Sequence, residues 1–179
     1  MKSRAFLYVA LILSISATAQ PTTFGSFKAE DQEIKFQKVF TQDSITVAKL
    51  EEFYKALPFV IDLSSTADGV SFYMNDVTVD FKKFQFRQVD IPTLVQTGKY
   101  SGKVNVGVRD GRYRVTISGM EITGDAGYRK ITAKEPFTNV ACMKSGTVLN
   151  PDWCKPNSFG LLEMVFTDKL QYVKKKDDW

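Results

Sequence analysis

Apolar and polar residues alternate with the period of a β-strand in the middle of the chain. Apolar positions recur through residues 104–108 and again through 113–117, on either side of the pair Asp110-Gly111. An Asp-Gly turn between two such runs predicts a β-hairpin, because the turn needs positive φ at both positions. The intervening residues are mostly charged, amide or hydroxyl residues, so we expect an antiparallel sheet with one buried and one solvated face.

Two earlier stretches also have strand character. Residues 59–63 and 70–74 alternate around Asp68-Gly69 and predict a first hairpin of the same kind. Residues 32–41 predict a strand with a slip or bulge near its end, where two apolar residues are adjacent.

The region between the hairpins fits no single period. Its apolar residues are compatible with a strand, and they are Phe81, Phe84, Phe86, Val89 and Ile91. Residues 92–95 favour a short helical turn, and a further strand is expected over residues 128–133, after a glycine-containing loop.

Helical spacing of apolar residues predicts two helices. The first opens near residues 43–46 and ends at Pro58, with its charged residues facing outward. The second covers the apolar positions between residues 161 and 173, with Ser158 as its cap and lysines near the negative end of the helix dipole. Residues 160–167 also fit a strand, and we favour the helix.

The first 19 residues have the three parts of a secretory signal peptide. Lys2 and Arg4 supply positive charge, residues 5–15 are almost wholly apolar, and residues 17–19 are small, as cleavage requires. A membrane anchor is the alternative, but the apolar run is far short of the roughly 20 residues that a spanning helix needs. We therefore predict an exported protein, periplasmic, associated with the outer membrane or secreted, without stable membrane insertion after cleavage.

The chain that remains after cleavage, from Gln20, is long enough for one domain with a substantial core. We expect a loosely docked polar lead over residues 20–31 and a single domain over residues 32–179. Loss of Lys2 and Arg4 leaves 22 basic and 20 acidic side chains, a net charge of +2, which argues against nucleic acid as a partner.

The chain contains no histidine at all. This excludes Ser-His-Asp and Cys-His catalysis and imidazole metal sites. No phosphate loop, nucleophile elbow, calcium loop or dinucleotide motif is present in the sequence either, and we expect no cofactor and no metal.

Cys142 and Cys154 are the two cysteines, and they flank an irregular stretch that contains Gly, Pro and Asn. In an oxidising compartment such a pair predicts a structural disulfide. A redox pair and a metal site are the alternatives. The spacing is not Cys-x-x-Cys, and two thiolates without histidine make a poor zinc site.

The solvated face of the second hairpin is the patterned polar feature of the sequence. Arg112 and Arg114 point the same way on one strand, with Lys103 and Arg109 on its neighbour. We take these four residues as a candidate binding face for an anionic polymer, such as a cell-surface polysaccharide, or for the acidic patch of a partner protein. The alternative is that the charges only keep the wet side of a sheet soluble and discourage edge pairing.

A family resemblance follows from the order of these elements. An export signal precedes an early strand, a short helix and a hairpin with the run Arg-Asp-Gly-Arg-Tyr-Arg at residues 109–114. Over residues 32–122 this resembles a Bacteroidetes-type family of exported domains of unknown function, whose fold is similar to that of the TATA-binding protein. The resemblance implies an α+β domain, a twisted antiparallel sheet with one or two helices on one face. It implies no activity, and a fold alone does not imply DNA binding.

Three functions are compatible with the sequence. The favoured one is a non-catalytic binding or interaction domain of the periplasm or cell surface, with an envelope protein or glycan as partner. The second is a hydrolase or lyase that uses Asp and Glu, for which Asp76, Asp80 and Asp90 are candidates if they converge. The third is a carrier of an apolar ligand, with a cavity lined by Phe81, Phe84 and Phe86.

Overall fold

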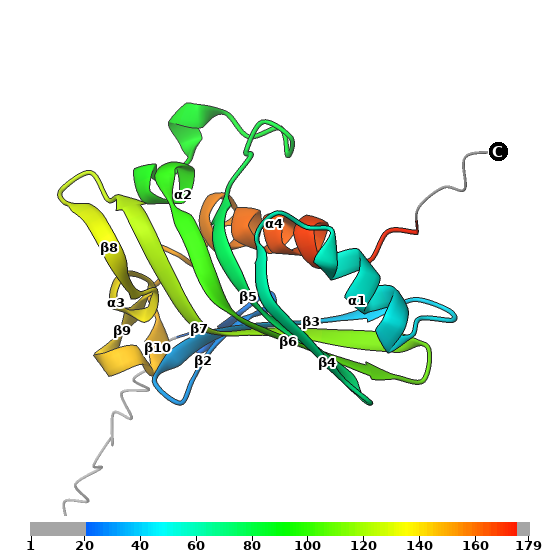
Figure 1. Ribbon diagram of the computed structural model, residues 1–179. Helices are drawn as coiled ribbons and strands as arrows, with labels where there is room; N and C mark the ends of the chain where they lie inside the picture. Colours follow the sequence, from blue (N-terminus) through cyan, green and yellow to red (C-terminus); the bar gives the residue numbers. More distant parts are fainter. Residues whose placement is uncertain (1–20, 175–179) are drawn as a thin grey trace, which may run out of the picture.

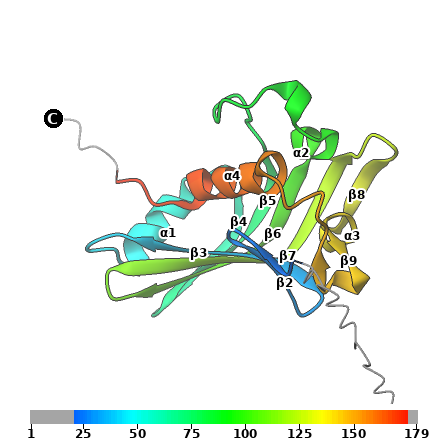
Figure 2. The same cartoon turned by 180° about the vertical axis from the view of Figure 1, so that it is seen from behind.

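The computed structural model describes residues 21–174. The predicted signal peptide, residues 1–19, lies outside these residues. In the described part, an eight-stranded antiparallel sheet has the strand order β1-β2-β3-β7-β6-β5-β4, with β8 also paired to β7. The helices α1 and α4 pack on one face of this sheet (Figures 1 and 2). The predicted α+β class, with an antiparallel sheet and helices on one face, is confirmed.

The strands are short at the beginning of the chain and long in the middle. They are β1 (Thr23–Phe24), β2 (Phe27–Glu30), β3 (Glu33–Thr41), β4 (Val60–Thr66), β5 (Gly69–Thr78), β6 (Lys99–Arg109), β7 (Arg112–Asp125) and β8 (Lys130–Pro136). A small separate sheet pairs β9 (Cys142–Met143) with β10 (Val148–Leu149). The helices are α1 (Val47–Lys55), α2 (Thr93–Thr97), α3 (Thr138–Ala141) and α4 (Leu161–Leu170), the last preceded by a π-helical turn over Pro156–Gly160.

Both predicted hairpins are present, but their turns differ. Asp110 and Gly111 have φ of 46° and 71° and join β6 to β7, as the sequence predicts. In the first hairpin Thr66 pairs with Gly69, so the turn lies one residue earlier than predicted and Gly69 begins β5. A Cβ atom at Gly69 would lie 2.1 Å from the carbonyl oxygen of Val106, so glycine is required there by the close approach of β6.

The register shifts at four places in the sheet, one of them between β7 and β8. The other three are β-bulges that curl the sheet. Each has a residue with positive φ at the break in register: Asp62 in β4, Asp76 in β5 and Gly119 in β7. On β7 the buried positions are odd-numbered before the bulge and even-numbered after it, from Ile117 to Met120. A bulge shifts the alternation by one residue and increases the local twist. The same face of β7 therefore stays in the core along the whole curved strand.

Two segments differ from the sequence predictions. The predicted loose lead over residues 20–31 contains a β-hairpin, formed by β1 and β2. Its Phe27 is buried, and the centroids of the Phe27 and Phe159 rings are 4.6 Å apart. The prediction of a strand through Phe81, Phe84 and Phe86 is wrong. These residues lie in the turns that follow β5, and their rings pack against the core. The short helix that follows is confirmed as α2.

The first strand and the last helix also correct details of the prediction. No bulge interrupts β3, which pairs with β7 in unbroken register from Phe36 to Thr41, with Lys38 turned toward α4 and Val39 toward solvent. The C-terminal run is a helix, not a strand. Ser158 is buried inside the π turn and does not cap the helix.

Glu163 ties the N-terminal hairpin to α4. Its carboxylate accepts hydrogen bonds from the Ser26 hydroxyl (2.7 Å) and backbone N–H (3.2 Å) and pairs with Lys38 Nζ at 3.0 Å. Burial alone would raise the pKa of Glu163, but these hydrogen bonds outweigh it and the pKa lies below its usual value.

We expect Glu163→Gln to lower the free energy of unfolding by about 1–2 kcal/mol at pH 7. Since the folded-state pKa is lowered, the carboxylate stabilises the fold above its unfolded pKa of about 4.3, and this contribution disappears as the pH falls through the folded pKa. Urea denaturation of both proteins at pH 7 and at acidic pH measures the difference. A difference that persists undiminished in acid would contradict the assignment. Asp43→Asn, at an exposed position, serves as the control.

Candidate binding face

The sheet face that points away from α1 and α4 is free of helices in the described residues (Figure 1). The structure places all four predicted basic residues on it, and all four are exposed. Arg109 pairs in register with Arg112, and Arg114 follows two residues further along β7, opposite Gly107. Lys103 lies on the same face but further from the turn, opposite Ser118. Three of the four therefore gather at the hairpin end of the sheet.

Most of this positive charge is not neutralised by neighbouring side chains. Arg109 has an ion pair with Asp110, at 3.3 Å. Within residues 21–174, no ion pair involves Lys103, Arg112 or Arg114. These three cations are therefore available to an anionic partner, and a partner that bound them would do so without displacing an internal salt bridge.

A hollow of about 320 Å³ lies toward the hairpin end of this face, and we call it the Gly107 hollow. It forms because β6 has no side chain at Gly107. This residue lies between Arg114 of β7 on one side and Gly69 of β5 on the other. Polar groups surround it, from Thr66, Asp68, Ser71, Asn105, Arg114 and Thr116. This hollow was not predicted from the sequence, although an isolated glycine inside a strand pattern is the signal that points to one.

A row of amide and hydroxyl side chains crosses five strands beside the hollow. In register it runs Gln37, Thr116, Asn105, Ser71 and Ser64, from β3 to β4. The Gln37 amide donates to the Thr116 hydroxyl at 3.3 Å, and the Ser64 and Ser71 hydroxyls are hydrogen-bonded at 2.8 Å. We call this the transverse polar row. It was not visible in the sequence, because its members come from five separate strands.

Further from the hairpin turns, polar side chains of the same face form hydrogen bonds with one another. Tyr73 donates a hydrogen bond to Glu121 at 2.5 Å, and Lys134 Nζ contacts the Asn75 side-chain oxygen at 2.7 Å. The ammonium group of Lys134 also lies 5.1 Å from the centre of the Tyr73 ring. Burial and the contact with Glu121 raise the pKa of Tyr73. This cluster ties β8 to β5, and none of the three unpaired cations is part of it.

The aspartates considered for acid–base chemistry have separate partners. Asp76 accepts from Ser101, Asp80 caps the backbone N–H of Lys83, and Asp90 pairs with Arg87 at 2.7 Å. The hydrogen bond to Arg87 lowers the pKa of Asp90. Among the described residues no group of three or more His, Cys, Asp or Glu could hold a metal ion. The contacts of the three aspartates thus do not form the paired carboxylates that a hydrolase or lyase would need.

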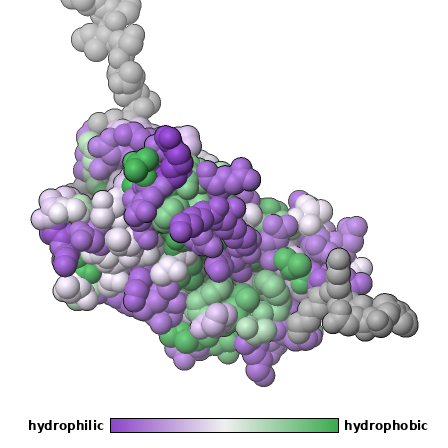
Figure 3. Space-filling model, turned by 90° about the horizontal axis from the view of Figure 1, so that it is seen from above, coloured by the Kyte–Doolittle hydropathy of each residue, from purple (hydrophilic) through white to green (hydrophobic). Residues whose placement is uncertain are grey.

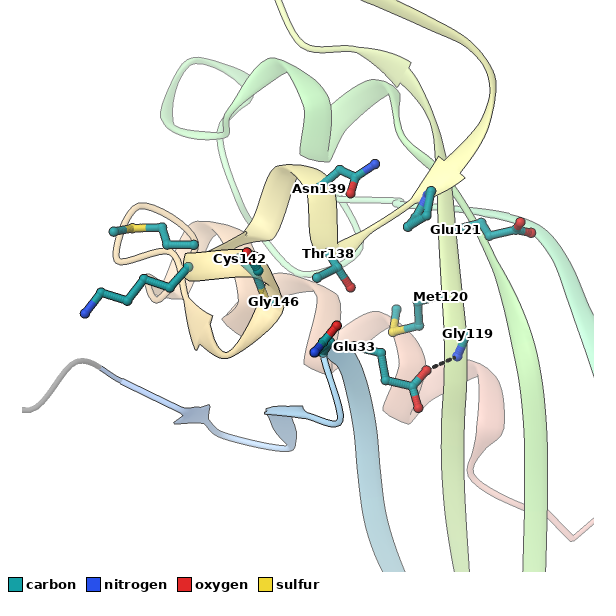
Figure 4. Close-up of a pocket in the computed structure, with 13 residues that line it drawn as sticks. Glu33, Gly119, Met120, Glu121, Thr138, Asn139, Cys142 and Gly146 are labelled. Atoms are coloured by element: carbon teal, nitrogen blue, oxygen red, sulfur yellow. Dashed lines mark hydrogen bonds between the residues drawn. The ribbon is translucent and has the colours of Figure 1, made fainter.

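A second cleft, of about 630 Å³, lies where β3 and β8 meet the same edge of β7 (Figure 4). Its centre is the bulge of β7, where Glu33 accepts a hydrogen bond from the backbone N–H of Gly119 at 2.9 Å. Thr138 and Asn139 of α3 lie across the opening, and Cys142 lines the far side. Its lining mixes carboxylate, amide, thiol and thioether groups without a common charge.

Both cysteines are free, so the disulfide predicted from the sequence is not formed in the structure. Burial raises the pKa of the Cys142 thiol to about 11, with a further contribution from the nearby Cys154 thiol. Burial also raises the pKa of Cys154. The raised pKa values keep both thiols in the protonated form near neutral pH. Disulfide chemistry needs a thiolate, so both cysteines are less reactive in this state.

The helical side of the molecule offers a groove of about 490 Å³ beside α4. Figure 3 shows this side from above, with apolar surface gathered beside the C-terminal end of the described chain and mostly hydrophilic residues elsewhere. Of the three phenylalanines proposed to line a carrier cavity, Phe84 lines this groove, together with Met164 and several charged or polar residues. The groove is therefore amphipathic and does not match the predicted Phe-lined cavity.

Comparison with known proteins adds one structural neighbour. No protein-family model matches the sequence, and no curated protein matches it. Among solved structures, a crystal structure of a DUF4468 family protein from Bacteroides ovatus is similar over 86% of this chain and 95% of that chain, with 13% identity and a TM-score of 0.45. The named family of this neighbour is one of unknown function, as is the Bacteroidetes-type family that the sequence resembles. It names no activity, and the likeness to the TATA-binding protein stays a prediction.

Proposed function

We propose that this chain is a non-catalytic binding module that acts after export, in the periplasm or at the cell surface. It binds an anionic component of the envelope with the uncovered face of its sheet. The observation that carries this proposal is the set of three unpaired cations, Lys103, Arg112 and Arg114, on a face that no helix of the described residues covers. One of them, Arg114, also lines the Gly107 hollow.

The geometry of this face supports binding over catalysis. Its polar groups are spread over five rigid strands, and the Gly107 hollow is open to solvent. Acid–base catalysis by a pair of carboxylates requires both of them to be held beside one reacting bond. A broad polar surface on a rigid sheet is suited instead to holding an extended ligand by many moderate contacts. No helix within residues 21–174 is long and apolar enough to cross a membrane.

Reversal of charge on this face is the direct test. In the protein from Gln20 to Trp179, we expect Arg112→Glu combined with Arg114→Glu to weaken binding to acidic envelope polysaccharide by at least about tenfold, because both attraction and steering are lost. Binding by the unmodified protein should also fall as salt is added, since the charges are exposed. Titration by biolayer interferometry on immobilised polysaccharide gives both quantities.

A matched control carries the same change in net charge elsewhere. Lys55 ends α1 and Lys82 follows β5, and both are exposed. The double variant Lys55→Glu, Lys82→Glu should bind as the unmodified protein does. If both double variants lose binding equally, net charge alone is responsible and the uncovered face is not the binding surface.

A further inference from the structure

We propose that the Gly107 hollow is the subsite for one carboxylate-bearing sugar unit, and that an acidic polysaccharide lies across the strands along the transverse polar row. This inference rests on the proposed function and names its ligand. An acidic polysaccharide and an acidic protein both carry carboxylates, so the chemistry of the hollow must decide between them.

Two opposite charges flank the hollow. Arg114 lies on β7 directly opposite Gly107, while Asp68 belongs to the turn that precedes Gly69, opposite Gly107 on the other side. Neither has an ion pair within the described residues. A guanidinium binds a carboxylate through two parallel hydrogen bonds, and an aspartate accepts hydrogen bonds from hydroxyl groups. A uronic acid has both kinds of group on one ring. A peptide of Asp or Glu residues carries carboxylates for Arg114 but no hydroxyl groups for Asp68.

The transverse polar row makes the site long enough to contact several units of a polymer. Adjacent strands lie about 4.8 Å apart, so five strands span roughly 19 Å, the length of a few sugar units. Along this line the side chains of Gln37, Asn105 and Ser71 offer both donors and acceptors. The bonds from Gln37 to Thr116 and between Ser64 and Ser71 fix four of these groups before a ligand arrives. Such preorganisation lowers the entropy lost on binding.

Gly107 itself provides a clean way to block the hollow. A Cβ atom added there would have no other heavy atom within 4 Å, and its φ is not positive. A β-branched residue is favoured in a strand, so Gly107→Val should fill the hollow without strain and without changing any charge. Circular dichroism and thermal denaturation of the variant verify that the fold is retained.

The experiment compares three probes and three variants in the protein from Gln20 to Trp179. The probes are polygalacturonate, its methyl-esterified form and polyglutamate. We expect the unmodified protein to bind polygalacturonate at least about tenfold more tightly than either other probe. Gly107→Val should weaken binding of polygalacturonate at least about tenfold, because the sugar unit no longer enters the hollow.

Asp68→Asn separates recognition of a sugar from simple charge attraction. It removes a negative charge, so an anion held by charge alone would bind more tightly. If Asp68 accepts hydroxyl hydrogen bonds from the sugar, binding becomes about threefold to tenfold weaker, because the charged acceptor is lost. Tighter binding would overturn the proposal.

The remaining outcomes are also decisive. If Gly107→Val binds polygalacturonate as the unmodified protein does while the Arg112, Arg114 double variant does not, the hollow is not the subsite and the proposed function stands. If neither change affects binding, both proposals fail. If polyglutamate binds as tightly as polygalacturonate, the ligand is an acidic protein and the inference of a polysaccharide is wrong.

Discussion

Phe159→Ala is expected to lower the free energy of unfolding by about 3–5 kcal/mol, because it leaves a cavity where a fully buried ring was. The ring of Phe159 lies 4.6 Å from that of Phe27 and 5.6 Å from that of Trp153. It also contacts Phe24 and Phe137. One side chain thus holds together the N-terminal hairpin, the cysteine-containing segment and the start of α4.

Urea denaturation followed by far-UV circular dichroism measures this loss. Phe159→Leu keeps most of the volume and should cost less, about 1–1.5 kcal/mol. Val89, which is 85% exposed, provides the control, and Val89→Ala should change stability by no more than about 0.5 kcal/mol. A loss of less than about 1 kcal/mol for Phe159→Ala would show that the three segments do not depend on this ring.

Elements that are determined by neighbouring residues could be predicted from the sequence. The turn at Asp110-Gly111 needs two left-handed residues, and that local requirement fixed the hairpin correctly. The first helix was found because its apolar spacing and its cap are both local, and the hydroxyl of Thr46 accepts from the backbone N–H of Lys49.

Elements that depend on distant partners could not be predicted. Residues 20–31 look polar and loose in the sequence, yet Phe27 becomes buried because Phe159, far along the chain, stacks on it. Residues 78–99 contain enough aromatic residues for a strand. Their rings instead cover the core from turns, and the hydrogen bonds of Phe84 and Phe86 return to the Phe81 carbonyl. In both cases tertiary packing overrides the local pattern.

The candidate site also has one part that could be predicted from the sequence and one part that could not. Alternation along one hairpin placed Lys103, Arg109, Arg112 and Arg114 on one face, and the structure agrees with that placement. The Gly107 hollow and the transverse polar row depend on the register of β3, β5 and β4 against this hairpin. No tight turn joins β3 or β5 to this hairpin, so the register of these two strands is set by the whole core and no local pattern contains it.

The second large effect concerns the cysteines. In the reduced, folded protein at pH 8, Cys142 should react with iodoacetamide roughly 10- to 100-fold more slowly than an exposed cysteine. Its pKa of about 11 leaves little thiolate at this pH, and the lower intrinsic nucleophilicity of a low-pKa thiolate offsets only part of that difference. The rate should rise about tenfold per pH unit below the pKa and become ordinary in urea, where the burial is lost. Mass spectrometry of timed samples gives the rate at each cysteine.

The same measurement on protein isolated from the cell envelope without reductant determines the state of the pair. Free thiols, as in the structure, would be alkylated at both positions as soon as urea exposes them. If neither cysteine reacts in urea until a reductant is added, the two are joined after export, and the disulfide predicted from the sequence exists in the cell although the structure does not contain it. In that case reduction should also destabilise the fold by about 3 kcal/mol, the entropy of closing a loop of this length. A pair that is free in the envelope and yet reacts at the rate of an exposed cysteine while folded would instead contradict the burial that raises both pKa values.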